Sequence, residues 1–373
     1  MKQIPKDFDI ATNAKPEQVK ALFRNCRLIG RRFLLAHVYF RNEIMEVATF
    51  RGHHDTANKD ETHSKEGLIV RDNVYGSIEE DAYRRDFTLN ALYYNPSNNT
   101  LLDYVGGISD LKKKRVSIIG NAETRYKEDP VRMLRALRFM SKLDFKLTRE
   151  TGDAIRKLNQ YISLTASARL FDEILKSFHN GYALKNYQVL QKYELFPRLF
   201  PVINTLTPEH RKNFDKLIDI ALKNTDERVR IGKAVSPAFL YAVILWYPIV
   251  EQAEKMGNRY KPFVTLEMAI EKILDKQIKT ISIPRKFTNT MRDIWRMQHF
   301  LTHRSPSRIQ RIYTHTKFRA AYDLLSLREQ TGEPLTEHVQ WWTEFQMLDE
   351  VKQEEMINAL QYKTRKKPRK LQE

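Results

Sequence analysis

Two aspartates, Asp7 and Asp9, flank a phenylalanine in the stretch "PKDFDIA" near the start of the chain. Alternate side chains of a β-strand point to the same face of the sheet, so a strand here would set both carboxylates side by side. Neighbouring carboxylates repel each other unless a cation lies between them. Mg²⁺ binds through one or two carboxylates together with substrate phosphates, and a pair of such ions can activate a hydroxyl and stabilise a leaving pyrophosphate. The spacing therefore indicates either a metal site or an exposed strand edge, because Asp-x-Asp is common by chance.

Two later segments each offer a further carboxylate. Glu46 lies in "EIMEVATF", which is typical of a β-strand, and Asp86 lies in "RRDFTLNALYY". Alternation of polar and apolar residues predicts a strand over residues 84–94, with its aspartate, Thr88 and Asn90 on one polar face. Two arginines precede the aspartate, and guanidinium groups fork onto phosphate oxygens. This face is either a ligand surface or the half-solvated side of a sheet.

A strongly helical segment at residues 128–143, "EDPVRMLRALRFMSKL", carries an arginine at every third position: Arg132, Arg135 and Arg138. Asp129 precedes the first arginine by three residues, so the two side chains share one helix face as a hydrogen-bond acceptor beside a donor. Adenine and cytosine present the complement, an amine beside a ring-nitrogen acceptor, whereas guanine and uracil do not. The pair therefore either selects A or C without a template or is a helix cap with a local ion pair.

The elements that must position these side chains change in character near residue 120. Before it, residues 16–23 predict a helix, and residues 34–40 and 43–50 predict two strands joined by a tight link. After it, the chain reads as one helix after another, interrupted at Pro-, Gly- or Ser-rich points. A chain of 373 residues is too long for one core, so we expect an α+β protein: a small head with a mixed sheet, followed by an all-helical neck and body.

Composition narrows the choice of partners and compartment. The net charge is +18, from 64 Lys and Arg against 46 Asp and Glu, and such a bias attracts polyanions, above all nucleic acid. A single cysteine, Cys26, excludes an internal disulfide and a cysteine-based metal cluster. The sequence offers no apolar run long enough for a membrane span and no signal peptide at its N-terminus, so we expect a cytoplasmic protein.

Together these features resemble one known family, the class II nucleotidyltransferases, which comprise the CCA-adding tRNA enzymes and the bacterial poly(A) polymerases. The resemblance runs almost unbroken from residue 5 to about residue 180. It rests on "PKDFDIATNA", "EVATFRGHH", "GSIEEDAYRRDFTLNALYY", "DYVGGISDL" and "RYKEDPVRMLRALRFMSKL". The basic tail and four later segments look like the poly(A) polymerase branch: "SPAFLYAVILWYP", "RDIWRMQ", "KFRAAYDLLSLR" and "WWTEFQ".

The resemblance implies roles for individual residues. Asp7 and Asp9 match the metal-binding pair of a two-metal Mg²⁺ site. Glu46 and Asp86 match two further catalytic acids of the family, and either can be the third metal ligand. The resemblance also implies a nucleotide site, in which Asp129 and Arg132 read the base and the remaining residues hold phosphate, ribose or primer: Arg84, Arg85, Asn90, Asp129, Arg132, Arg135 and Arg138.

The resemblance further implies an activity and a domain organisation. The activity is template-independent addition of AMP from ATP to RNA 3′ ends by a monomer, which promotes RNA processing and decay, with RNA-decay proteins as candidate partners. The organisation is a nucleotidyltransferase head at 1–120, a nucleotide-selecting and RNA-binding neck at 121–185, an RNA-binding helical body at 186–362 and a basic tail at 363–373.

One departure from the family concerns the N-terminus. The family carries a Gly-Gly-x-x-Arg-Asp loop, which cradles the triphosphate, just before the Asp-x-Asp strand. This sequence has no such loop ahead of Asp7, so we expect an N-terminally incomplete head that lacks its first strand. Two alternatives to poly(A) synthesis therefore stay open. One is CCA addition to tRNA, to which the Asp129 and Arg132 pair is equally suited, and the other is a catalytically impaired RNA-binding protein.

Overall fold

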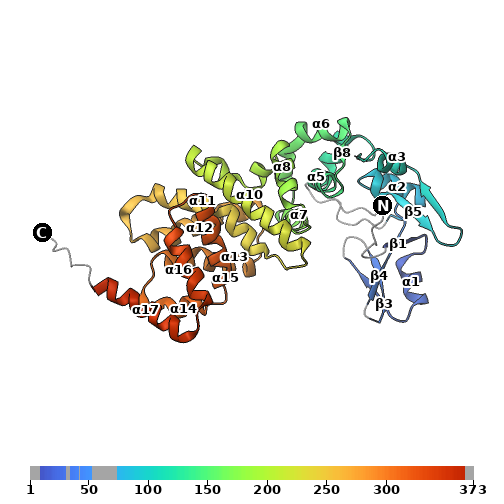
Figure 1. Ribbon diagram of the computed structural model, residues 1–373. Helices are drawn as coiled ribbons and strands as arrows, with labels where there is room; N and C mark the ends of the chain where they lie inside the picture. Colours follow the sequence, from blue (N-terminus) through green and yellow to red (C-terminus); the bar gives the residue numbers. More distant parts are fainter. Residues whose placement is uncertain (1–8, 31–33, 42, 53–73, 366–373) are drawn as a thin grey trace. The chain divides into compact units, whose positions relative to one another are not determined.

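The computed structural model describes residues 9–30, 34–41, 43–52 and 74–365 (Figure 1). The chain divides into two compact units. One comprises Met1–Glu128 and Leu143–Ala154, and the other comprises Asp129–Lys142 and Ile155–Glu373. Among the described residues, every strand lies in the first unit, and the second unit is built from helices.

A four-stranded mixed sheet begins the first unit. β1 (Asp9–Thr12) and β4 (Glu43–Thr49) pair in parallel. β3 (Leu35–Phe40) and β2 (Cys26–Ile29) continue the sheet in antiparallel pairing, in the order β1-β4-β3-β2. A helix, α1 (Pro16–Leu22), begins with proline at its first position, where no intrahelical hydrogen bond is lost. The mixed sheet, this helix and the two strands predicted before residue 50 are confirmed.

One face of the sheet packs against α1. The buried residues come from the helix and three strands, and each is at most 9% exposed: Val19, Cys26, Ala36, Val38 and Val47.

 

Because side chains alternate along a strand, the residues between these buried positions face the opposite side of the sheet. His37 lies between Ala36 and Val38, and Glu46 directly precedes Val47, so both side chains lie on the face opposite α1. This alternation leaves one side of the sheet available for polar chemistry.

The predicted strand over residues 84–94 is wrong for most of its length. α2 (Ile78–Arg84) ends at residue 84, where the strand was predicted to begin, and a 3₁₀ turn occupies Thr88–Asn90. A strand, β5 (Leu92–Asn95), begins only near its end. The segment is therefore a helix end, a turn and a strand start rather than one continuous strand.

Two buried anchors explain why this segment turns. Phe87 is fully buried and forms an isolated β-bridge with Ile118. Thr88 is 5% exposed, and its hydroxyl donates a hydrogen bond to Asp110 Oδ2 at 2.8 Å. The predicted polar face therefore does not form, because burial within a turn produced the same alternation as a strand.

β5 and β6 (Thr100–Asp103) form an antiparallel hairpin that leads into the "DYVGG" loop and α3 (Gly107–Lys112). The carboxylate of Asp103 accepts hydrogen bonds from four consecutive backbone N–H groups, those of residues 105–108, at 2.8–3.2 Å. A single carboxylate thus organises the whole loop at the start of α3.

The same loop requires both of its glycines. Gly106 has a φ of 82°, in the left-handed region that favours glycine. A Cβ at Gly107 would lie 2.3 Å from the carbonyl oxygen of Thr88, which no side chain tolerates. This close approach packs the loop against the 3₁₀ turn that follows Asp86.

Asp103→Asn should destabilise the first unit by about 1.5–3 kcal/mol, the usual cost of losing hydrogen bonds to a charged group. Burial alone would raise the pKa of Asp103, but the four backbone N–H donors outweigh burial and lower the pKa below its ordinary value. A lowered native pKa stabilises the fold above the unfolded-state pKa of about 4, and this stabilisation is lost as the pH falls through the native pKa. Thermal unfolding of both proteins from neutral to acidic pH measures the effect.

A matched control is Asp153→Asn, which removes the same charge from an exposed ion pair with Arg149. This change should cost less than about 1 kcal/mol. A penalty for Asp103→Asn that stays constant as the pH is lowered would contradict the role given to the Asp103 charge.

The first unit closes with a short parallel pair of strands, β7 (Arg115–Val116) and β8 (Lys146–Leu147). The segment predicted as an all-helical neck is therefore not entirely helical, because the two residues of β8 pair with a strand of the head. The remaining elements after residue 120 are mostly α-helices. They are α4 (Ala122–Glu128), α5 (Val131–Leu143), α6 (Arg149–Leu158), α7 (Ser167–Phe178), α8 (Ala183–Lys192), α9 (Phe196–Leu199), α10 (Pro208–Arg230), α11 (Pro237–Met256), α12 (Pro262–Thr280), α13 (Arg285–Thr302), α14 (Ile309–Tyr313), α15 (Phe318–Gln330), α16 (Thr336–Met347) and α17 (Glu350–Arg365).

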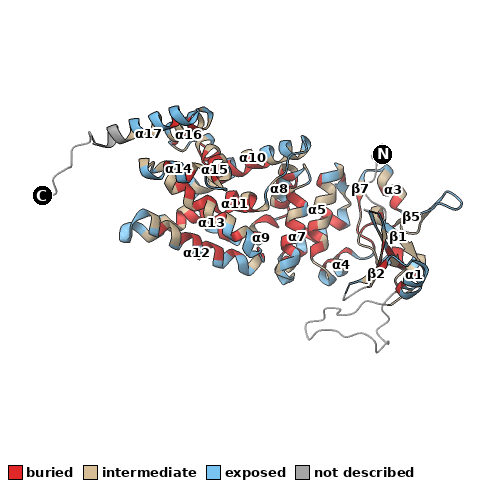
Figure 2. Ribbon diagram, turned by 90° about the horizontal axis from the view of Figure 1, so that it is seen from below, coloured by how far each residue is buried: buried red, intermediate tan, exposed pale blue. Residues whose placement is uncertain are grey.

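α11 forms the core of the helical unit. Most of its residues from Ala238 to Glu251 are buried, and α10, α12 and α13 pack against it (Figure 2). Trp295 of α13 donates from Nε1 to the carbonyl oxygen of Ala242 at 3.0 Å, which joins the two helices. Within the described ranges, no helix combines the length and apolarity that crossing a membrane requires.

Candidate active site

A row of ionisable side chains crosses the face of the sheet opposite α1. The strand register places Glu46 opposite Asp9 on one side and opposite His37 on the other. Arg27 continues the row next to His37. Paired residues on neighbouring strands point to the same face, so these side chains lie next to one another. His37 Nε2 and Glu46 Oε1 are 3.6 Å apart, and the Glu46 side chain is 52% exposed.

The two carboxylates at one end of this row fit a divalent metal ion. Carboxylate oxygens are the ligands that Mg²⁺ prefers, and two acids held opposite each other favour a cation between them. Asp7, predicted to share the face of Asp9, lies outside the described residues. In the part of the chain that the structure describes, no group of three or more His, Cys, Asp and Glu side chains is placed to hold a metal. Among the described residues, Asp9 with Glu46 is therefore the candidate donor set.

Asp86 is engaged within its own turn. Its Oδ1 accepts hydrogen bonds from the Phe87 N–H at 2.9 Å and from Asn90 Nδ2 at 3.0 Å. Asn90, predicted to bind nucleotide, thus orients the Asp86 carboxylate. Of the two alternatives for the third acid, Glu46 is the residue that the strand register sets opposite Asp9.

Arginines hold the turn that carries Asp86. Arg84 Nη1 donates to the Gly52 carbonyl oxygen at 2.6 Å, which ties α2 to the chain that leaves β4. Arg125 of α4 donates through Nη2 to the carbonyl oxygens of Arg84 and Arg85, both at 2.7 Å. Arg125 is a positioning residue that the sequence reasoning missed, because its partners are backbone atoms distant in the chain.

Arg85 is the centre of a compact polar cluster. Its Nε donates to Asp81 Oδ2 at 3.1 Å and to Tyr93 Oη at 2.9 Å, and its Nη1 donates to the Asn90 carbonyl oxygen at 3.2 Å. Burial and the hydrogen bond to Asp81 raise the pKa of Tyr93 well above its ordinary value, so its hydroxyl stays protonated. The predicted contact of Arg85 with triphosphate or ribose must therefore compete with three partners inside the protein.

In the second unit, Asp129 stands two residues before the first residue of α5. Its Oδ1 accepts a hydrogen bond from the Val131 N–H at 3.3 Å, as a helix cap does. Arg169 of α7 donates hydrogen bonds to both oxygens of this carboxylate, from Nη1 to Oδ1 at 3.1 Å and from Nη2 to Oδ2 at 2.9 Å. A bidentate pair fixes the plane of a carboxylate, so Arg169 orients the acceptor that was predicted to read the base. The sequence reasoning paired Asp129 with Arg132 and missed Arg169.

Arg135 and Arg138 converge on a buried carboxylate. Glu173 of α7 is 5% exposed, and its oxygens lie 4.0 Å from Arg135 Nη1 and 3.4 Å from Arg138 Nε. A buried charge is tolerated when it is paired, so these arginines dock α5 against α7. Arg169 and Glu173 stand four residues apart on α7, and this spacing was the signal from which both could have been found.

Three family models match the chain. The model described as poly A polymerase head domain matches residues 1–117. The model described as probable RNA and SrmB-binding site of polymerase A matches residues 144–206, and the model described as polymerase A arginine-rich C-terminus matches residues 258–373.

Relatives match almost the whole chain. It is 46% identical to poly(A) polymerase I of Salmonella typhimurium over 367 residues, which are 95% of this chain and 78% of the relative. It is 45% identical to poly(A) polymerase I of Haemophilus influenzae over 373 residues, which are 98% of this chain and 82% of the relative. The chain belongs to the poly(A) polymerase I family. The resemblance to the poly(A) polymerase branch of the class II nucleotidyltransferases is thereby confirmed.

CCA-adding enzymes are more distant relatives of this poly(A) polymerase I family member. The Bacillus subtilis CCA-adding enzyme is 36% identical over 203 residues, which are 54% of this chain and 49% of that enzyme. A solved Bacillus stearothermophilus CCA-adding enzyme in complex with CTP has a TM-score of 0.55 at 22% identity, with 90% of this chain and 71% of the other covered. A CCA-adding enzyme in complex with ATP has a TM-score of 0.57 at 19% identity, with 92% and 74% covered. These structures confirm the fold.

Proposed function

We propose that this chain is a template-independent polynucleotide adenylyltransferase, which transfers AMP from ATP to RNA 3′ ends. The observation that carries the proposal is the 46% identity to a poly(A) polymerase I over 95% of the chain. The facing carboxylates of Asp9 and Glu46 support it, because they supply the acids that the reaction needs. Such tailing would take place in the cytoplasm and would serve RNA processing and decay.

The transfer forms one bond and breaks another at the α-phosphorus of ATP. The RNA 3′-oxygen attacks this phosphorus and its proton passes to solvent. The bond to the bridging oxygen of the β-phosphate breaks, and pyrophosphate leaves with the electron pair. Asp9 and Glu46 would hold Mg²⁺, with Asp7 as a further ligand. Bound Mg²⁺ supplies positive charge that acidifies the hydroxyl and stabilises the leaving pyrophosphate.

Residues of the chain orient the nucleotide for this reaction. The Asp129 carboxylate, whose orientation the bidentate pair with Arg169 fixes, accepts a hydrogen bond from the adenine amine. Arg132 donates a hydrogen bond to the neighbouring ring nitrogen. Guanine would set a carbonyl oxygen against the carboxylate, and an unsatisfied pair of acceptors is costly. Arg84 would add positive charge for the triphosphate or ribose, and Arg135 and Arg138 would support the triphosphate or primer.

Primer extension with each nucleotide alone tests this function. We expect long products from an oligo(A) primer with ATP, shorter products with CTP, and little product with GTP or UTP. Equal use of GTP would refute the base-reading role of Asp129 and Arg132. Addition that is confined to tRNA and stops after CCA would identify a CCA-adding enzyme instead.

RNA affinity should fall steeply as salt rises. The net charge of +18 favours contacts with phosphates, and each such contact releases counterions on binding. A protein that makes several phosphate contacts loses about 10³–10⁵ in affinity over a fourfold rise in salt. Fluorescence anisotropy of labelled oligo(A) over such a range measures the slope, and a flat response would contradict binding through phosphates.

A further inference from the structure

The helical unit contains a cavity of about 560 Å³ that the proposed reaction does not use. It lies between α10, α11 and α15, and its size suits a nucleoside, since ligand pockets span about 300–1,000 Å³. Polar, charged and aromatic side chains line it: Asn224, Arg228, Phe239, Arg319, Asp323 and Gln330. This combination differs from the apolar contacts that fill the core of the same unit.

A carboxylate in this cavity interacts electrostatically with two arginines. Arg319 Nε and Asp323 Oδ1 are 3.0 Å apart on successive turns of α15, and Arg228 of α10 acts on the same carboxylate. Burial raises the pKa of Asp323 above its ordinary value, although both arginines oppose this rise. The Asp323 side chain is 36% exposed, so its carboxylate is partly withdrawn from water, where a hydrogen bond to a ligand gains strength.

The remaining lining suits a flat ring. Phe239 contributes an aromatic ring to the lining, and Val235 and Ala320 add apolar surface. Aromatic faces stack on nucleobases of single-stranded RNA, and the side-chain amides of Asn224 and Gln330 can donate or accept hydrogen bonds at the ring edge. An acceptor beside a donor, next to apolar surface, is what recognition of a nucleobase requires.

We propose that this cavity binds one adenosine of the RNA tail. The Asp323 carboxylate accepts a hydrogen bond from the adenine amine, Arg319 donates to the neighbouring ring nitrogen, and Arg228 contacts a phosphate. Uracil and guanine place a carbonyl oxygen where the carboxylate needs a donor, so the cavity distinguishes a poly(A) tail from RNA that is rich in U or G. The inference rests on the proposed function, because the tail it holds is the product of that reaction.

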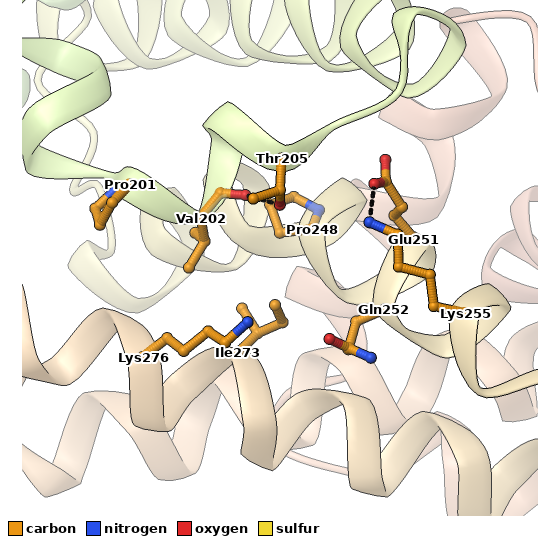
Figure 3. A pocket seen from close by; sticks show the side chains of 9 residues that line it. All are labelled: Pro201, Val202, Thr205, Pro248, Glu251, Gln252, Lys255, Ile273 and Lys276. Carbon is orange, nitrogen blue, oxygen red and sulfur yellow. Dashed lines mark hydrogen bonds and ion pairs between the residues drawn. The ribbon is translucent and has the colours of Figure 1, made fainter.

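A second cavity of the same unit, of about 420 Å³, has a different character (Figure 3). Its carboxylate, Glu251, is 3% exposed and accepts hydrogen bonds from Lys255 Nζ at 2.5 Å and from the Thr207 N–H at 2.7 Å. Val202 and Pro248 give it apolar surface. Glu251 therefore fastens the start of α10 to α11, and its engaged oxygens serve the fold rather than a base.

Binding of labelled oligo(A) and oligo(U) of equal length tests the adenosine site. Asp323→Asn replaces one acceptor oxygen by a donor, and Arg319→Gln removes a guanidinium whose side chain is 73% exposed, with little risk to folding. Each change should weaken oligo(A) binding about tenfold, within the range that one bidentate base contact provides, and leave oligo(U) binding unchanged. Ala320→Phe, which fills the cavity, should have the same effect.

The matched control is Asp219→Asn on α10, which removes the same charge outside the cavity and should leave both affinities unchanged. Equal losses for oligo(A) and oligo(U), or no loss with either Asp323→Asn or Arg319→Gln, would overturn the site. Binding of free AMP tests whether the cavity holds a lone nucleotide rather than an adenosine of the RNA tail. Tight AMP binding that Asp323→Asn abolishes, with oligo(A) binding intact, would also overturn the proposed site. Selective oligo(A) binding by a protein that makes no poly(A) would support the site and refute the proposed function.

Discussion

Asp9→Asn should abolish AMP addition while RNA affinity stays the same or rises slightly. Asp9 faces Glu46 across two parallel strands, so the change removes one of the two described carboxylates that would hold Mg²⁺. Loss of one preorganised electrostatic group costs about 10²–10³ in rate, and loss of a metal ligand should cost at least as much. RNA binding depends on cationic side chains at phosphates, so the loss of a negative charge does not weaken it. Single-turnover primer extension and RNA anisotropy measure the two effects.

Glu43→Gln is the control for this experiment. Glu43 lies on the same strand as Glu46 but three residues earlier, so it points to the other face, and its loss should leave the rate unchanged. Mn²⁺ titration distinguishes the two alternatives for the third acid. Weaker Mn²⁺ binding in Glu46→Gln than in Asp86→Asn would assign the role to Glu46, and the reverse order would assign it to Asp86. An Asp9→Asn protein that keeps wild-type rates would exclude the metal site.

Arg169→Gln should lower the preference for ATP over GTP. The bidentate pair with Arg169 holds the Asp129 carboxylate in one plane, and without it the acceptor no longer keeps a fixed position against the base. A specific bidentate base contact provides about 1–3 kcal/mol of discrimination, so we expect a loss of about 10- to 100-fold in the ratio of kcat/KM values. Steady-state extension with each nucleotide measures this ratio, and Asp129→Ala should reduce it at least as far.

Arg149→Gln provides the comparison for Arg169→Gln. Arg149 forms an exposed ion pair with Asp153, and its side chain is 91% exposed, so the change should leave both kcat/KM values near those of the wild type. A drop in kcat/KM that is the same for ATP and GTP in Arg169→Gln would show that Arg169 supports the fold of α5 and α7 and has no part in base choice.

Local spacing explains how much of the site could be predicted. Asp9, Glu46 and Asp129 were predicted as site residues because strands alternate and helix neighbours recur after three or four residues, rules that act within one element. The same rules failed over residues 84–94. There Phe87 is buried by a bridge to Ile118, and alternation within one segment cannot distinguish burial in a turn from burial in a strand.

The sequence by itself determined the family, the mixed-sheet head, the helical body and the charge that attracts RNA, because composition, periodicity and motif spacing are properties of short segments. Only the tertiary structure decided which partners the candidate site residues contact. It set Glu46 opposite Asp9, joined Arg169 to Asp129, and brought Arg228 and Asp323 to one cavity. Strand register and helix packing make these pairings, and both depend on apolar burial summed over a whole unit rather than on neighbours in the chain.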